Sequence, residues 1–184
     1  MKVKGSVVKS IDDYVKEKYP DGHKNWRSGL SDDSKKIYDK SIFATEWYPM
    51  QDGVITPTEV YSAMINKGAN EIAWDGGEYS AEVALTGIYK VFVLIASPEF
   101  LMKRAKKILA AFYTPAEIEI VESDPKGMSI RITKITGKSG ILENRMGGWM
   151  KKALETCGCK ELDIQIVKAI SKGDAYTEYT IKWI

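Results

Sequence analysis

Hydrophobic positions recur at helical spacing through most of the first 113 residues of the chain. Residues 3–8 fit a short strand or an ordered arm, and the first helices are predicted over residues 10–18, 31–40 and 57–68. Residues 78–96 contain few turn-forming residues and carry two wide apolar faces, so this helix is expected to be central. A fresh start at Ser97 and Pro98 predicts another helix that continues to residue 113.

The period of the pattern changes after residue 116. Residues 117–120 and 128–133 alternate apolar and polar side chains on either side of a turn at 124–127, which predicts a β-hairpin. Helical spacing returns over residues 141–156, and Gly158 is a suitable C-terminal cap. A second hairpin begins at residue 162, and its last strand places four side chains on one face: Thr177, Tyr179, Ile181 and Trp183.

This order of elements predicts an α+β fold, because short turns join antiparallel strands and cannot make parallel crossovers. We expect a helical N-terminal layer packed on an antiparallel sheet formed by a ββαββ C-terminal half. The length of 184 residues suits one substantial core, so residues 1–184 are predicted to form a single ligand-binding-like domain.

Charge is nearly balanced, with 27 Lys plus Arg against 25 Asp plus Glu, so we expect no nucleic-acid partner. The one basic run, residues 103–107, is predicted to be the solvated face of an amphipathic helix, and binding of acidic lipid or protein is the alternative. The buried face of that helix is expected to carry Phe100, Leu101, Ile108, Leu109 and Phe112.

Location is inferred from missing signals. No secretory segment follows Met1, and no uncharged stretch reaches the ~20 residues of a membrane span, so we expect a cytoplasmic protein with no integral membrane segment. Cys157 and Cys159 are separated by one residue, which would strain a mutual disulfide, and no other cysteine exists to complete a zinc site. They are expected to be reduced thiols, with a redox or metal function as the lesser alternative.

The chain lacks the residue sets of common catalytic sites. His23 is the one histidine, and its place beside the turn at residues 20–22 predicts an exposed side chain. Neither a Gly-x-Ser-x-Gly elbow, a Walker phosphate loop nor a dinucleotide-binding Gly-x-Gly-x-x-Gly is present. We therefore expect no enzyme activity, no catalytic residue, no metal site and no cofactor.

Aromatic side chains suggest a pocket between the helices and the sheet. The candidate pocket residues are Trp47, Tyr48, Tyr79, Tyr89, Phe92 and Trp149, together with Glu82. Glu82 is included because a carboxylate buried inside the most apolar helix would need a partner or a shifted pKa. Plain core filling is the alternative for the rings, whereas a pocket would be largely apolar and suit a small hydrophobic ligand.

The closing hairpin resembles a known domain. Residues 167–183 contain Gly173-Asp174 and look like the end of the four-vinyl-reductase domain, where one Cys stands four residues before the Gly-Asp pair and another three residues after it. Here those positions are Ala169 and Thr177, so a metal or redox function of those cysteines does not carry over. Gly173-Asp174 is instead interpreted as a turn, in which Gly permits unusual backbone angles and Asp bonds neighbouring amides.

The resemblance extends over nearly the full chain. Residues 4–9, 47–49, 79–82 and 85–89 are similar to an uncharacterised bacterial family. That family is related to the four-vinyl-reductase domain, the haem-nitric-oxide-binding domain and the TRAPP trafficking subunits, which form one superfamily of ligand-binding folds. The Tyr-x-Ser-x-Arg signature of the haem sensors is absent, and His23 is far from the position of their ligand histidine, so haem is not expected.

Two function classes follow from these observations. The leading hypothesis is a non-enzymatic small-molecule-binding or sensory domain with an apolar pocket between helices and sheet. The alternative is a dimeric protein-interaction or scaffold module of the trafficking-subunit kind, a homodimer formed through its helices. A place in tetrapyrrole metabolism would rest on the name of the related domain alone.

Overall fold

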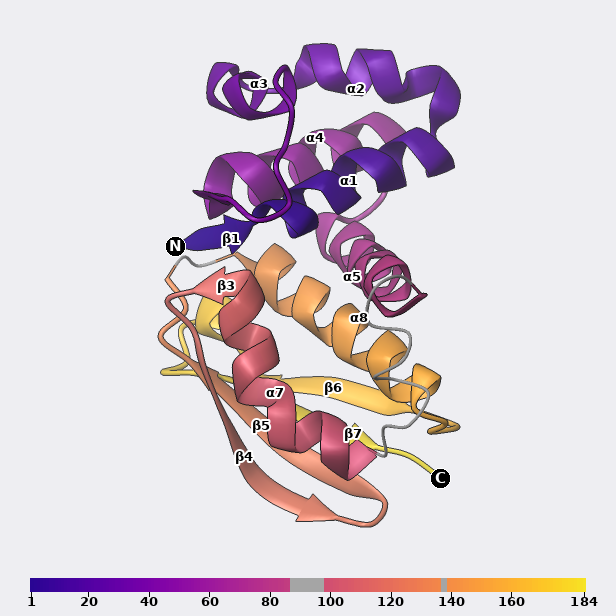
Figure 1. Cartoon of the computed structure of the whole chain (residues 1–184), viewed down its shortest axis with the longest axis vertical. Helices are drawn as coiled ribbons and strands as arrows, with labels where there is room; N and C mark the ends of the chain where they lie inside the picture. The colour runs from indigo at the N-terminus through magenta and orange to yellow at the C-terminus, as the bar shows by residue number, and fades with distance from the viewer. Residues whose placement is uncertain (87–97, 137–138) are drawn as a thin grey trace.

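The computed structural model describes residues 1–86, 98–136 and 139–184 (Figure 1). The N-terminal part is helical and includes α1 (Gly5–Lys18), α2 (His23–Gly29), α3 (Asp32–Tyr38), α4 (Thr56–Ile65) and α5 (Ala69–Thr86). Two further helices, α7 (Pro98–Phe112) and α8 (Gly140–Thr156), belong to the C-terminal part. Short helical turns also occur at η1 (Pro20–Gly22), η2 (Gln51–Ile55) and η3 (Ile170–Lys172).

The strands form two antiparallel sheets. The small sheet has the order β2 (Trp47–Pro49), β1 (Lys2–Lys4) and β3 (Tyr113–Thr114). The larger sheet has the order β4 (Glu117–Asp124), β5 (Gly127–Thr133), β7 (Thr177–Lys182) and β6 (Asp163–Lys168). Helices α7 and α8 lie over the larger sheet, while α1 to α4 gather at the opposite end of the molecule (Figure 1). The predicted α+β fold, with a ββαββ C-terminal half, is confirmed.

Two N-terminal boundaries differ from the prediction, and one short strand was not predicted. Helix α1 begins at Gly5, so Ser10 lies inside the helix and does not cap it, and its Oγ donates to the carbonyl of Val7 at 2.8 Å. The segment Trp47–Pro49 pairs with β1 as a strand, because the chain returns alongside the N-terminus. The expected central helix starts earlier, at Ala69, and the predicted portion beyond Thr86 lies outside the described residues.

The closing hairpin agrees with its prediction. The four inward positions of its last strand are all buried, with exposures of 0% for Thr177, Tyr179 and Ile181 and 9% for Trp183. At the turn, Gly173 has φ of 99°, a left-handed value that favours glycine, and Oδ2 of Asp174 accepts from the amide of Ala169 at 2.7 Å.

Helices α5 and α8 cross with their backbones in contact. A Cβ at Gly77 would lie 2.1 Å from the carbonyl oxygen of Arg145, and one at Gly148 would lie 2.1 Å from that of Trp74. No side chain fits at either position, so glycine permits this approach. The crossing fixes the axial position and the rotation of α8 relative to α5. It therefore also fixes where Arg145 and Trp149 lie. In the described part of the chain, no helix is long and apolar enough to cross a membrane.

Candidate functional site

A cavity of about 470 Å³ lies between the helices and the larger sheet. Its helical walls are formed by Ser6, Val7 and Ser10 of α1, Ser80, Val83 and Ala84 of α5, Leu101, Ala105, Ile108, Leu109, Ala111 and Phe112 of α7, and Met146, Trp149, Met150, Ala153 and Leu154 of α8. Strand residues and loops complete it with Lys4, Ala44, Thr45, Tyr113, Ile118, Ile130, Ile132 and Ile181. Most of these side chains are apolar, so the cavity suits an apolar molecule.

The spacing of apolar residues along the strands and helices explains this lining. Alternation along β5 turns Ile130 and Ile132 inward, and both are 1% exposed. On α7, Lys106 and Lys107 lie on the opposite face and Arg104 at its border. All three are exposed, which confirms the solvated face for these described members of the basic run. The apolar face of α7 is only partly covered: Leu109 is buried, whereas Leu101, Ile108 and Phe112 are half-buried beside the cavity. Phe100 was also predicted on the buried face of this helix, but its side chain is not among those that the structure describes.

Part of the cavity wall is polar and is backed by a buried charge. Arg145 of α8 is 3% exposed, and its Nη2 donates to Oγ of Ser10 at 2.8 Å. The side chain of Tyr113 also interacts favourably with its guanidinium. Burial lowers the pKa of Arg145, because water no longer solvates the guanidinium. Ser10 and Tyr113 both line the cavity, so the charge lies one hydrogen bond behind its surface.

A second buried charge joins α8 to the closing hairpin. Glu143 is 2% exposed, and its Oε1 accepts from Oγ1 of Thr177 at 2.6 Å and from the amide of Ser171 at 3.2 Å. Its other oxygen accepts from the hydroxyl of Ser171. Thr177 therefore helps to hold the hairpin against α8. A smaller polar pocket of about 320 Å³ lies beside this cluster.

Trp149 is the one described candidate residue that lines the cavity. Its ring lies 6.3 Å from that of Phe112, centroid to centroid. Tyr79 packs instead on Tyr14 in the helical core, with ring centroids 5.4 Å apart, because it faces α1 and not the sheet. Tyr89 and Phe92 lie outside the described residues. Whether these residues contact a ligand stays a prediction.

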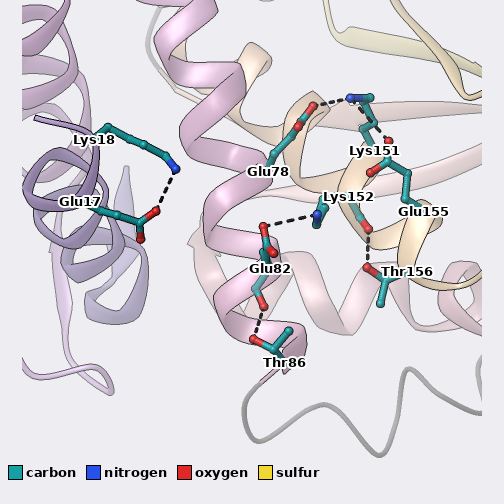
Figure 2. A network of polar contacts seen from close by, with 9 residues as sticks. All are labelled: Glu17, Lys18, Glu78, Glu82, Thr86, Lys151, Lys152, Glu155 and Thr156. Carbon is teal, nitrogen blue, oxygen red and sulfur yellow. Dashed lines mark hydrogen bonds and ion pairs between the residues drawn. The ribbon is translucent and has the colours of Figure 1, made fainter.

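The remaining candidates lie on or near the surface. Trp47 is 36% exposed, with Nζ of Lys4 at 4.1 Å from its ring centroid, and the half-buried Tyr48 accepts from the amide of Phe43. The expectation of a buried Glu82 is wrong: its side chain is 57% exposed and its carboxylate lies 3.4 Å from Nζ of Lys152. Figure 2 shows this pair beside the bridge from Glu78 to Lys151, along the outer edge of the α5–α8 crossing.

His23 and the cysteines lie elsewhere. The expectation of an exposed histidine is wrong, because His23 is half-buried and its Nε2 lies 2.9 Å from Oδ1 of Asp12, joining α2 to α1. Arg27 binds the same oxygen at 3.1 Å. No disulfide joins Cys157 and Cys159, and burial raises the pKa of the Cys157 thiol. No cluster of three metal-ligating side chains occurs among the residues that the structure describes.

Sequence reasoning missed Ser10, Tyr113 and Arg145. Arg145 carried a signal, because it falls three residues after Leu142 and four after Ile141 on the apolar face of its predicted helix. An arginine on such a face must bury its charge or displace the helix. Tyr113 had no comparable signal, since it was placed at the end of a helix and in fact begins β3.

The fold is shared with solved H-NOX proteins. An H-NOX protein from S. oneidensis in the Fe(II)NO state is 13% identical, with a TM-score of 0.76 over 98% of this chain and 99% of that one. An oxygen-binding H-NOX domain related to soluble guanylate cyclases, in its oxygen complex, is 15% identical, with a TM-score of 0.70 over 98% and 94% of the chains. An H-NOX protein used to probe haem distortion is 16% identical, with a TM-score of 0.70 and the same coverage. Neither a family model nor a curated protein matches the sequence.

The cavity residues do not fit the haem that this fold implies. Protein haem iron is usually held by histidine, cysteine, tyrosinate or a methionine–histidine pair. The lining that the structure describes contains no histidine or cysteine, and the one histidine of the sequence, His23, is held by Asp12 outside it. Burial raises the pKa of Tyr113, which disfavours a phenolate ligand. The thioethers of Met146 and Met150 therefore have no histidine to complete an axial pair.

Proposed function

We propose that this chain is a non-enzymatic small-molecule-binding domain, of a sensory kind, whose ligand occupies the cavity between the helices and the larger sheet. The observation that carries the proposal is the cavity itself. Its volume of about 470 Å³ lies within the ~300–1,000 Å³ of ligand pockets. Its walls are mostly aliphatic and aromatic, so the favoured ligand is a small hydrophobic molecule.

The likeness of fold gives independent support. The similar H-NOX proteins bind NO or oxygen in the same arrangement of helices over an antiparallel sheet. Because the described cavity lining offers no axial ligand for haem, the arrangement would here hold an organic ligand. Its resemblance to the four-vinyl-reductase domain stays a prediction. A cytoplasmic location is also proposed, supported by cysteines that form no disulfide with each other.

The test uses the neutral fluorescent probe N-phenyl-1-naphthylamine. Ala105 lines the cavity from α7, so Ala105→Phe fills it, while Ala63→Phe makes the same change at an exposed position of α4. We expect wild type and Ala63→Phe to bind with similar Kd, and Ala105→Phe to bind at least about tenfold more weakly because ring and probe compete for one space. Equal binding by the two variants would refute the proposal.

Native mass spectrometry addresses the natural ligand. Protein purified without denaturant is expected to carry a small molecule that is lost from Ala105→Phe and retained by Ala63→Phe. A mass equal to the bare polypeptide, together with no probe binding, would count against a ligand-binding domain.

The alternative of a dimeric scaffold has less support. The large apolar side chains exposed among the described residues are scattered over loops, helix α5, sheet edges and the C-terminus. They are Phe43, Trp47, Val83, Ile120, Val121, Val167 and Ile184, and none belongs to α1 to α4. A stable dimer formed through the first helices would need a contiguous apolar patch there.

A further inference from the structure

Arg145 is a buried charge without a buried counter-charge. Among the described residues no carboxylate oxygen lies within the 4.0 Å of an ion pair with its guanidinium. Its hydrogen-bonded partner among the described side chains is the neutral hydroxyl of Ser10, and the side chain of Tyr113 lies beside it. A buried cation that contacts only neutral oxygens remains costly, because hydroxyls replace part of its hydration and no anion offsets its charge.

Near Arg145, one hydroxyl proton, that of Tyr113, is not used in a hydrogen bond within the described part of the protein. Arginine has no acceptor, so toward Tyr113 the guanidinium can only donate and the phenol oxygen can only accept. The hydroxyl proton of Ser10 is used, because Oγ donates to the carbonyl of Val7 at 2.8 Å. Within the described part of the chain, no hydrogen bond is found in which the Tyr113 hydroxyl donates to a protein acceptor. Tyr113 lines the cavity, so a ligand there can accept this proton.

We infer that the cavity recognises an amphiphile with an anionic head, a carboxylate, which accepts a hydrogen bond from Tyr113 in front of Arg145. This inference rests on the proposed function and specifies its substrate class. A hydroxyl that accepts from a guanidinium is polarised and donates more strongly. The apolar tail then extends along α7 and α8 past Leu109 and Trp149. The head supplies the charge that the fold itself lacks beside Arg145.

A matched ligand pair tests the inference. Decanoate and decan-1-ol share a chain and differ in the head, and both can displace N-phenyl-1-naphthylamine at pH 8, where decanoate is ionised. Wild type is expected to bind decanoate about 10- to 100-fold more tightly than the alcohol, as for hydrogen bonds to charged groups. Tyr113→Phe should lose most of that preference and change decan-1-ol affinity less than about threefold.

Three controls define the other outcomes. Tyr61→Phe removes a hydroxyl from another buried tyrosine outside the cavity and should keep the preference. Arg145→Met should remove it, and if this variant does not fold, Tyr113→Phe decides alone. Lys4 also lines the cavity, so loss of the preference in Lys4→Met but not in Tyr113→Phe would place the head at Lys4 and overturn the inference.

The result also separates this inference from the proposed function. Equal binding of decanoate and decan-1-ol by wild type would overturn the anionic head, make Arg145 a brace between α1 and α8, and leave an apolar-ligand domain. Displacement by neither ligand, with no binding of the probe, would overturn both.

Discussion

The crossing of α5 and α8 can be tested by adding one methyl group. In Gly148→Ala the new Cβ would lie 2.1 Å from the carbonyl oxygen of Trp74, about 1.3 Å short of ordinary contact at 3.4 Å. The obstacle is backbone, so the two helices must separate. Overpacking of this kind costs about 1–3 kcal/mol or more, and a rigid neighbour puts it at the upper end. Alanine returns ~1 kcal/mol of helix propensity, which leaves a net loss of about 2 kcal/mol.

The control is Gly68→Ala, where the nearest atom to a new Cβ is Cβ of Glu71 at 4.0 Å. That change should be neutral or stabilising by under ~1 kcal/mol, because it restricts the unfolded chain. Urea unfolding followed by circular dichroism measures both free energies, and thermal melting should show Gly148→Ala about 4–8 °C below wild type. A Gly148→Ala variant as stable as Gly68→Ala would refute backbone contact at the crossing, and with it the placement of Arg145 and Trp149.

Three further changes probe other contacts. Thr177→Val removes a donor to the buried Glu143 and should lower the unfolding free energy by about 1–3 kcal/mol in urea titrations; a neutral result would mean that water replaces the hydroxyl. Burial raises the pKa of Tyr14 from 10.0 to about 12, so the unfolded chain loses this proton first and stability should fall by about 2–3 kcal/mol between pH 10 and 12. Tyr14→Phe should flatten that fall, and an unchanged slope would contradict the assignment. Glu82→Ala breaks an exposed pair with Lys152 and should cost under ~1 kcal/mol, whereas a larger loss would indicate a buried carboxylate.

The C-terminal half was the most predictable part of the fold. Alternation of period two fixes which residues of a strand share a face, so the burial of Tyr179 and Ile181 followed directly from the sequence. Gly173 and Asp174 act locally in a turn, so their function can be predicted from neighbouring residues alone.

The helical half was harder to predict because its limits depend on partners far away in sequence. Ser10 has the chemistry of a helix cap, yet β1 ends at Lys4 and α1 starts at once, so the hydroxyl is used inside the helix. Glu82 has apolar neighbours along the chain, but the rotation of α5 set by its contact with α8 turns it outward to Lys152.

The type of candidate site was predicted from the sequence, but only some of its residues were. An apolar space between helices and sheet was expected, and Trp149 borders it. Aromatic content alone could not separate Trp149 from Tyr79, because one faces the sheet and the other packs on α1. The pairing of Tyr113 with Arg145 joins residues 32 positions apart, and no local pattern reveals such a contact.

A crystal structure of the protein co-crystallised with decan-1-ol tests the central claim most directly. The account predicts electron density for the chain of the alcohol between α7, α8 and the inner face of the larger sheet, beside Leu109 and Trp149. An interior closed by repacked side chains, with the alcohol absent or bound elsewhere, would contradict it.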